Sequence, residues 1–254
     1  MAPKAQSKDF AILDCLGGVH WPASLFASWR LTLPRSGTVA LLGASGIGKS
    51  SLFEVLLSFS KGQPQQGFAW QLNVCDQAQP LRLSLLRQNT GLLPWLSAVE
   101  NVVLRDKVQG LKPDYSAAAV ILDKLGFDAH EKAAKPVQLS GGQAQRVGLA
   151  RILYEQADIV LLDEPFSALD WPRKQALQQL FAKELKGKLT LLITHDPYEA
   201  LQMADSCLVL AGKPAGPQLT LNLQDQGLRD VTSLEHSRAI KALIQALGKD
   251  KLSI

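Results

Sequence analysis

Apolar residues follow two different spacings along the chain, and the change between them predicts the type of each element. Apolar positions alternate around residues 25–33 and 38–42, which indicates two strands separated by a turn at Pro34–Gly37. After Gly48 the spacing becomes helical, and four apolar residues share one face: Leu52, Val55, Leu56 and Phe59. The first part of the chain therefore predicts strand, turn, strand and helix in that order.

The middle of the chain predicts a helical region followed by further strands. Residues 97–151 are mostly helical in pattern, with a break rich in Gly and Pro at 126–142. Two short apolar runs at 159–162 and 189–193 flank a helical stretch at 172–185. Apolar runs separated by helices are typical of a parallel sheet with crossover helices. We therefore expect an α/β fold.

The last forty residues predict a turn and one amphipathic helix. Residues 212–217 are rich in Gly and Pro, and a capping box spans Thr232–Glu235. An apolar stripe follows at helical spacing: Ile240, Leu243, Ile244 and Leu247. Because amphipathic helices usually cover a core, we expect this helix to pack back on the domain, with an interaction helix as the alternative.

Composition narrows the class of protein. The 27 basic and 23 acidic residues leave a net charge of +4, too even to indicate nucleic-acid binding. Cys15, Cys75 and Cys207 are far apart and show no metal-ligand spacing, which suits a reducing cytosol. The longest uninterrupted apolar run, 117–122, is well short of the roughly 20 residues a spanning helix needs. We expect a soluble chain without a signal peptide.

Residues Gly43–Ser50 fit the phosphate-binding pattern G-x-x-x-x-G-K-[ST], between a predicted strand and a predicted helix. Glycines let the backbone turn its N–H groups toward a phosphate, and the helix N-terminus adds partial positive charge. Lys49 supplies a charge for the outer phosphates, and the Ser50 hydroxyl suits Mg²⁺. This segment predicts a nucleotide site.

The run Asp158–Pro165 is a second candidate for the same chemistry. Its apolar centre predicts a buried strand that ends in Asp163 and Glu164. Strand alternation would send these carboxylates to different sides, one toward a metal and the other toward a water. Such an ending is often only structural, but beside a phosphate loop it predicts a metal-binding Asp163 and a general base at Glu164.

The pentapeptide Leu139–Gln143, Leu-Ser-Gly-Gly-Gln, decides the resemblance. With the two preceding motifs it resembles the nucleotide-binding subunits of ABC transporters over roughly residues 8–213. The resemblance implies a P-loop NTPase core with a mostly parallel sheet, and a helical subdomain at about 96–155 that carries the signature motif. It places the ATPase domain at 1–213 and a C-terminal tail with an amphipathic helix at 214–254.

The resemblance also implies a role for each matching residue. Glu164, His195 and Gln88 would be catalytic, and Ser50, Gln88 and Asp163 would hold Mg²⁺. ATP would contact the phosphate loop, the signature motif of a second subunit and the D-loop aspartate: Gly43, Ala44, Ser45, Gly46, Ile47, Gly48, Lys49, Ser50, Ser51, Ser140, Gly141, Gly142, Gln143 and Asp170. The four histidines lack the spacing of metal ligands. Without the resemblance, a single histidine after a strand, such as His195, would be interpreted as a structural residue.

Two positions depart from the family pattern. Trp21 lies 22 residues before Gly43, near where the family places an aromatic that stacks on adenine, with His20 beside it. A core or surface tryptophan is the alternative for this residue. Arg87 precedes Gln88 where the family generally carries an aromatic.

Leu92–Trp95, Leu-Leu-Pro-Trp, resembles importers of nitrate, sulfonates, taurine and thiamine-related pyrimidines. A stiffened turn with an aromatic suits a socket for a permease helix, and a buried hydrophobic turn is the alternative. The resemblance implies a homodimer at the cytoplasmic face of the membrane, transmembrane permease subunits, a solute-binding protein and no nucleic acid. An exporter or lipoprotein-extracting ATPase is the competing function, and a soluble factor of translation or repair is disfavoured.

Overall fold

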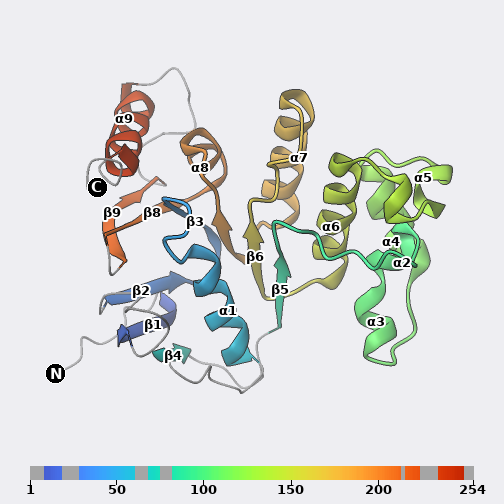
Figure 1. The fold of residues 1–254 in the computed structure, drawn as a ribbon, viewed down its shortest axis with the longest axis horizontal. Helices are drawn as coiled ribbons and strands as arrows, with labels where there is room; N and C mark the ends of the chain where they lie inside the picture. Colours follow the sequence, from blue (N-terminus) through green and yellow to red (C-terminus); the bar gives the residue numbers. More distant parts are fainter. Residues whose placement is uncertain are drawn as a thin grey trace. The chain divides into compact units, whose positions relative to one another are not determined.

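The computed structural model describes residues 9–18, 29–60, 68–74, 82–212, 215–223 and 234–248. The chain divides into two compact units (Figure 1). The first unit consists of residues 1–83 and 186–254, and the second of residues 84–185. Within the described ranges, no helix is both long enough and apolar enough to cross a membrane.

The first unit contains two sheets. Its elements are β1 (Asp9–Gly18), β2 (Trp29–Pro34), β3 (Gly37–Gly43), α1 (Lys49–Ser60), β4 (Phe68–Val74), β7 (Leu189–Ile193), α8 (Pro197–Met203), β8 (Ser206–Ala211), β9 (Gly216–Asn222) and α9 (Leu234–Gly248). One sheet is antiparallel in the order β2-β1-β4, and the other runs β7-β3-β8-β9. In the second sheet β3 is parallel to both β7 and β8, whereas β9 is antiparallel to β8.

Strands β3 and β7 are buried along most of their length, so the alternation predicted for residues 38–42 is wrong. All five residues of β7 are buried, as are Val39–Gly43 of β3. Parallel strands that are covered on both faces need apolar side chains on both, so alternation disappears. By contrast β9 contains only half-buried and exposed residues. The predicted mostly parallel sheet is therefore confirmed in this unit.

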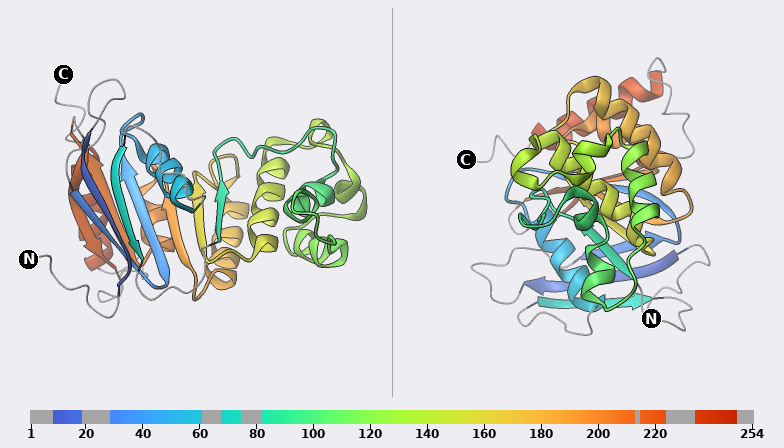
Figure 2. Two further views of the ribbon diagram at one scale, coloured as in Figure 1. Left: turned by 90° about the horizontal axis from the view of Figure 1, so that it is seen from below. Right: turned by 90° about the vertical axis from the view of Figure 1, so that its right-hand side faces the viewer.

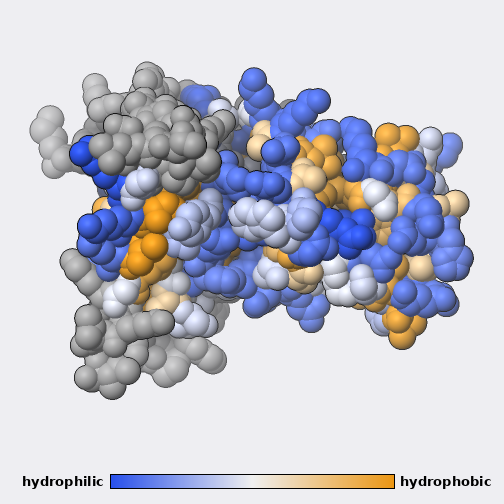
Figure 3. Space-filling view, turned by 90° about the horizontal axis from the view of Figure 1, so that it is seen from above, coloured by the Kyte–Doolittle hydropathy of each residue, from blue (hydrophilic) through white to orange (hydrophobic). Residues whose placement is uncertain are grey.

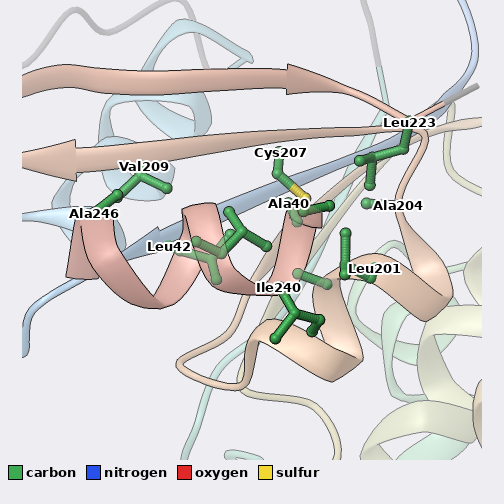
Figure 4. Packing of buried hydrophobic residues seen from close by; sticks show 12 residues of the cluster. Ala40, Leu42, Leu201, Ala204, Cys207, Val209, Leu223, Ile240 and Ala246 are labelled. Carbon is green, nitrogen blue, oxygen red and sulfur yellow. The ribbon is translucent and has the colours of Figure 1, made fainter. Parts of the chain in front are cut away.

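Helix α9 packs against other elements of the first unit, as the sequence predicts (Figure 4). Its buried face meets β8 and α8 in a cluster that includes Leu42, Leu201 and Val209 together with Ile240 and Leu243. One residue of the predicted apolar stripe, Ile244, is 50% exposed. A single helix packed on one surface buries only the side chains that face it, so Ile244 remains in solvent. The start of the predicted capping box, Thr232 and Ser233, lies outside the described residues.

The second unit contains two strands and the larger set of helices. Its elements are β5 (Leu83–Leu86), α2 (Ala98–Val102), α3 (Leu104–Val108), α4 (Tyr115–Lys124), α5 (Ala129–Ala133), the 3₁₀ helix η1 (Pro136–Gln138), α6 (Gly141–Glu155), β6 (Ile159–Asp163) and α7 (Trp171–Glu184). Strand β5 is hydrogen-bonded to β6. Figure 2 shows α2 to α6 gathered into one helical group.

The predicted break at 126–142 contains short helices of its own. Asp128 caps α5, its side chain accepting from the Glu131 N–H while the Glu131 side chain accepts from the Asp128 N–H. The same reciprocal arrangement joins Ser140 and Gln143 at the start of α6. Such boxes satisfy N–H groups that a helix start leaves unpaired. The pattern of apolar residues predicts an irregular segment at 126–142, but the capping side chains stabilise helix starts within it.

Candidate nucleotide-binding and catalytic site

The phosphate-binding loop of the first unit depends on glycine at three positions. Gly43, Gly46 and Gly48 have φ values of 151°, 78° and 106°, which favour glycine. A Cβ on Gly43 would lie 2.6 Å from the Leu210 carbonyl oxygen of β8. At the end of β3 the backbone of Gly43 thus lies so close to the backbone of Leu210 that only glycine fits at this position.

The Lys49 side chain is hydrogen-bonded to the backbone at the start of this loop. Its Nζ donates to the carbonyl oxygens of Gly43 at 2.8 Å and Ala44 at 2.9 Å, and the residue is only 9% exposed. Helix α1 begins at Lys49, so its first N–H groups face the same loop. Ser50 is exposed, and Ser51 is partly buried. The arrangement concentrates positive charge and donors where the sequence predicts phosphates.

His195 lies at the same edge of the sheet as the loop. It follows β7, whose residues Leu191–Ile193 pair in parallel with Val39–Leu41 of β3. The Thr194 N–H donates to the Leu41 carbonyl at 3.3 Å, which fixes the chain just before the histidine. Because neighbouring parallel strands end at the same edge of a sheet, His195 just after β7 and Gly43 at the end of β3 lie at that edge. The side chain of His195 is exposed.

In the second unit, Gln88 and Glu164 meet although they are 76 residues apart. The Gln88 Nε2 donates to the Glu164 Oε2 at 3.1 Å. Glu164 has a φ of 49°, in the left-handed region that non-glycine residues rarely adopt. Strand β6 ends at Asp163, so the predicted strand alternation between Asp163 and Glu164 is wrong. The side-chain direction of Glu164 is set by this turn.

Gln145 holds that turn from the signature helix. The residue is 4% exposed, and its Nε2 donates to the carbonyl oxygens of Glu164 at 3.2 Å and Pro165 at 2.8 Å. Ser167 Oγ donates to the same Glu164 carbonyl at 3.0 Å. The sequence did not predict a role for Gln145. Residues 145–150 of α6 are all buried, and the polar side chain at the start of this buried run is the one signal of its role.

The signature motif forms the start of α6. The Ser140 Oγ accepts from the Gln143 N–H at 3.2 Å, and the Gln143 Nε2 donates to the Glu131 Oε1 at 2.6 Å. A Cβ on Gly142 would lie 3.3 Å from the Ala168 carbonyl oxygen, so the helix packs closely on Ser167–Asp170, the segment that matches the family's D-loop. Asp170 ends that loop and caps α7 by accepting from the Arg173 N–H at 3.1 Å.

The predicted site residues thus divide between the two units. The phosphate loop and His195 belong to the first, whereas Gln88, Asp163, Glu164, the signature motif and Asp170 belong to the second. Trp21, the predicted adenine-stacking residue, lies outside the described residues, as does His20. Over the described ranges, no cluster of three or more His, Cys, Asp or Glu side chains could hold a metal.

Comparison with protein families gives a direct match. The sequence profile of the ABC transporter family matches residues 26–167, which include the phosphate loop, Gln88 and both motifs at Leu139–Gln143 and Asp163–Glu164. This chain belongs to the ABC transporter family. ABC proteins of this type are ATPases, and the chain is accordingly an ATP-binding, ATP-hydrolysing subunit.

Individual relatives cover most of the chain. An uncharacterized ABC transporter ATP-binding protein of Haemophilus influenzae is 42% identical, covering 74% of this ABC chain and 76% of its own length. The aliphatic sulfonates import ATP-binding protein SsuB 3 of Nocardia farcinica is 39% identical, and the taurine import ATP-binding protein TauB of Pseudomonas aeruginosa is 37% identical. Each of these two matches covers 84% of this chain and 80% of the relative.

A solved structure supports the fold. A dimeric ATP-binding cassette in a post-hydrolysis state, bound to ADP and Pi, superposes with a TM-score of 0.71. The sequences are 24% identical, and the match covers 84% of this chain and 98% of the cassette. The predicted α/β P-loop NTPase architecture is therefore confirmed for this ABC family member.

Proposed function

We propose that this chain is the ATPase subunit of an importer that takes up a small solute of the sulfonate or taurine class. The observation that carries the proposal is its 37–39% identity, over 84% of the chain, to import ATP-binding proteins for aliphatic sulfonates and taurine. Such a subunit works at the cytoplasmic face of the membrane, beneath two permease subunits. A solute-binding protein on the other side would deliver the substrate.

In this function Glu164 is the general base for the attacking water. Its carboxylate accepts from Gln88, which orients it, and Gln145 holds its backbone carbonyl. A base must be held in one direction to abstract a proton efficiently. Lys49 and the N–H groups at the start of α1 would bind the phosphates, and His195 would contact the γ-phosphate.

The available oxygen donors fit Mg²⁺. Ser50 presents an exposed hydroxyl in the first turn of α1, and Asp163 a carboxylate at the end of β6. The Gln88 amide nitrogen donates to Glu164, so its carbonyl oxygen is the atom suited to a cation. Hydroxyl, carboxylate and amide oxygens are the ligands that this hard ion prefers. When bound, it would neutralise charge on the β- and γ-phosphates.

A second copy of the chain would complete the site. The solved cassette with the same fold is a dimer. Ser140 is exposed at the N-terminus of α6, a 15-residue helix whose first N–H groups carry partial positive charge. We assign Ser140, Gly141, Gly142 and Gln143 to the phosphate of the ATP held by the partner subunit, and Asp170 to the contact between the two chains.

The turn Leu92–Trp95 supports docking on a permease. The Leu93 N–H donates to the Asn101 Oδ1 at 2.8 Å, and the Asn101 Nδ2 donates to the carbonyls of Leu93 and Leu96. Asn101 itself is fully buried, so the turn is fixed from within. Trp95 points outward with 65% of its surface exposed, which contradicts the buried-turn alternative for this side chain.

The surface around this helical group is suited to a protein partner. Figure 3 shows hydrophobic residues interrupting a mostly hydrophilic surface over the part formed by α2 to α6. An exposed aromatic on a rigid turn loses little conformational entropy when it is buried by a partner, so it can contribute much to affinity. Trp95 is therefore the side chain we expect at the centre of the permease contact.

Co-purification with the detergent-solubilised permease tests this function. Trp95→Ala should weaken docking by at least about thirtyfold, since a central aromatic anchor contributes about 2 kcal/mol or more. Hydrolysis by the isolated subunit should remain near wild type, because Trp95 is not among the residues assigned to the nucleotide or to catalysis. Trp171→Ala, which removes another exposed tryptophan (61% exposed), is the matched control and should dock normally. Unchanged docking of Trp95→Ala would refute the assignment.

A further inference from the structure

Gln88 lies in a short exposed segment between two anchored positions. Strand β5 ends at Leu86, which is fully buried, and residues 87–89 are exposed. The chain returns to the protein at Thr90, which is half-buried, and Gly91 follows with a φ of 59°. Three exposed residues rarely keep a side chain in one direction by themselves, since exposed loops are the most mobile part of a fold. The contacts made by Leu86 and Thr90 therefore decide where Gln88 lies.

Arg151 of α6 anchors the second end of this segment. Its Nη2 donates to the Thr90 carbonyl oxygen at 2.5 Å, although the two residues are 61 positions apart in the sequence. A hydrogen bond from a charged donor is stronger than one between neutral groups. Burial lowers the pKa of the Arg151 guanidinium, and the charge of Glu155, one turn further along α6, raises it. The backbone after Gln88 is thus held by a partly buried cation.

Gly148 lets the same segment lie close to α6. A Cβ at this position would lie 2.7 Å from the Leu86 Cδ1 and 3.2 Å from the Thr90 Cγ2. Leu86 is fully buried, so the surrounding core leaves it little room to move aside. Glycine weakens the interior of a helix relative to alanine, and here the room that it leaves explains its presence. The chain can therefore pass directly against α6 on both sides of Gln88.

A third contact from the same face of α6 fixes strand β5. The Ser84 Oγ donates to the Glu155 Oε2, and Ser84 is only 2% exposed. Gly148, Arg151 and Glu155 follow one another at intervals of three and four residues, so they share one helix face. This face contacts β5 and also the segment that follows it. Gln88 therefore lies between two stretches of backbone that a single helix face holds.

We propose that Arg151 and Gly148 are positioning residues for ATP hydrolysis that hold the backbone on both sides of Gln88. The Gln88 amide then stays in contact with Glu164, whose Oε2 lies 3.1 Å from the Gln88 Nε2. This inference rests on the roles proposed above for Gln88 and Glu164. Without the Thr90 anchor, ATP still binds, but Gln88 moves away from the base. The chemical step slows, whereas the affinity for the nucleotide is kept.

Steady-state ATP hydrolysis by the full chain tests the proposal. In Arg151→Gln the kcat should fall by about tenfold or more, while the KM for ATP changes by less than about twofold. Arg151→Lys keeps a charged donor and should recover part of the kcat. Arg105→Gln is the matched control, because Arg105 also donates to a backbone carbonyl, that of Glu155 at 3.4 Å, at the end of α6. This control should keep the wild-type kcat.

A double-mutant cycle separates this role from general support of the fold. Gln88→Ala should lower the kcat, and adding Arg151→Gln should lower it little further, because Arg151 acts through Gln88. A purely structural role would give the same loss in both backgrounds, and that result would overturn the proposal.

The same cycle shows which assignment has failed. An unchanged kcat in Gln88→Ala would refute the role of Gln88 and this proposal with it. A loss in Gln88→Ala without a loss in folded Arg151→Gln would overturn the role of Arg151 alone. None of these assays contains the permease, so the proposed import function does not depend on their outcome.

Gly148→Ala decides the question if Arg151→Gln does not fold, which circular dichroism shows. Alanine favours the helix, so α6 is kept, but the added methyl group displaces Leu86 and Thr90. The kcat should fall in the wild-type background and change little further in Gln88→Ala. A wild-type kcat for folded Gly148→Ala would contradict the proposal.

Discussion

The side-chain amide of Gln88 donates to the carboxylate of Glu164 across a distance of 3.1 Å. Gln88 follows β5 and Glu164 follows β6, and these strands are neighbours in the sheet. The glutamine proposed to bind Mg²⁺ and the proposed general base therefore lie at adjacent strand ends and contact each other. The fold of the second unit brings both side chains together.

Glu164→Gln preserves the shape of the side chain but removes the base. Hydrolysis should fall by roughly 10²–10⁴-fold, the usual range for loss of a general base, while ATP binding persists. A stable ATP-bound dimer should accumulate and be visible by gel filtration. Near-normal turnover by this variant would disprove the role proposed for Glu164.

Gln145→Ala tests the support of the catalytic turn. Its loss leaves the Pro165 carbonyl without the 2.8 Å hydrogen bond and weakens the hold on Glu164. The free energy of unfolding should fall by about 1–3 kcal/mol, the cost of an unsatisfied buried polar group. The kcat should fall more than the KM changes. Gln109→Ala, at an exposed position, should alter neither quantity; a variant of Gln145 with wild-type stability would contradict this interpretation.

Helix α9 offers a pair of adjacent residues with opposite burial. Leu243 is fully buried against the first unit, whereas Ile244 is 50% exposed. Leu243→Ala should lower the free energy of unfolding by about 2–5 kcal/mol, and Ile244→Ala should cost far less. Urea unfolding followed by fluorescence measures both. Equal effects would mean that α9 does not pack as described.

Cys207 should be chemically silent in the folded protein. The thiol is buried in β8, and burial raises its pKa to about 12, so little reactive thiolate forms at pH 8. Alkylation followed by mass spectrometry should modify Cys207 only after unfolding in urea. Rapid modification of the native chain at this residue would contradict its burial.

The same thiol makes stability depend on pH at alkaline values. An unfolded thiol loses its proton near pH 9, while the folded one keeps it to about pH 12. Its contribution is therefore constant below pH 9 and is lost as the pH rises from 9 to 12, by at most about 1.4 kcal/mol per unit. Comparing urea unfolding of the wild type with that of Cys207→Ala at pH 8.5 and 10.5 isolates this contribution.

Much of the fold could be predicted because the deciding signals are local. The apolar runs at 159–162 and 189–193 became β6 and β7, and the periodic stretch after Gly48 became α1. The phosphate loop was recognisable because its glycines have backbone angles that few other residues adopt. The predicted boundaries of the ATPase domain, helical subdomain and tail stay a prediction.

The remaining features depend on contacts between distant residues. The alternation at residues 25–33 located β2, but β1 and β4, which pair with each other in antiparallel fashion, were not predicted. The left-handed turn at Glu164 is held by Gln145, which lies 19 residues earlier on another element. Likewise Ile244 fits a helical stripe, and only the one-sided packing of α9 shows that it stays in solvent. Tertiary contacts override local pattern at these positions.

One feature of α6 links two functions that the sequence presents as separate motifs. Its first turn carries Ser140 and packs through Gly142 on Ala168, and its second turn holds the Glu164–Pro165 backbone through Gln145. Since a helix of this length moves as a rigid rod, any displacement of Ser140 is transmitted to Glu164 along one element. A partner subunit that engages Ser140 would thus act mechanically on the base of the chain it touches, and the two ATPase cycles of a dimer would be coupled through α6.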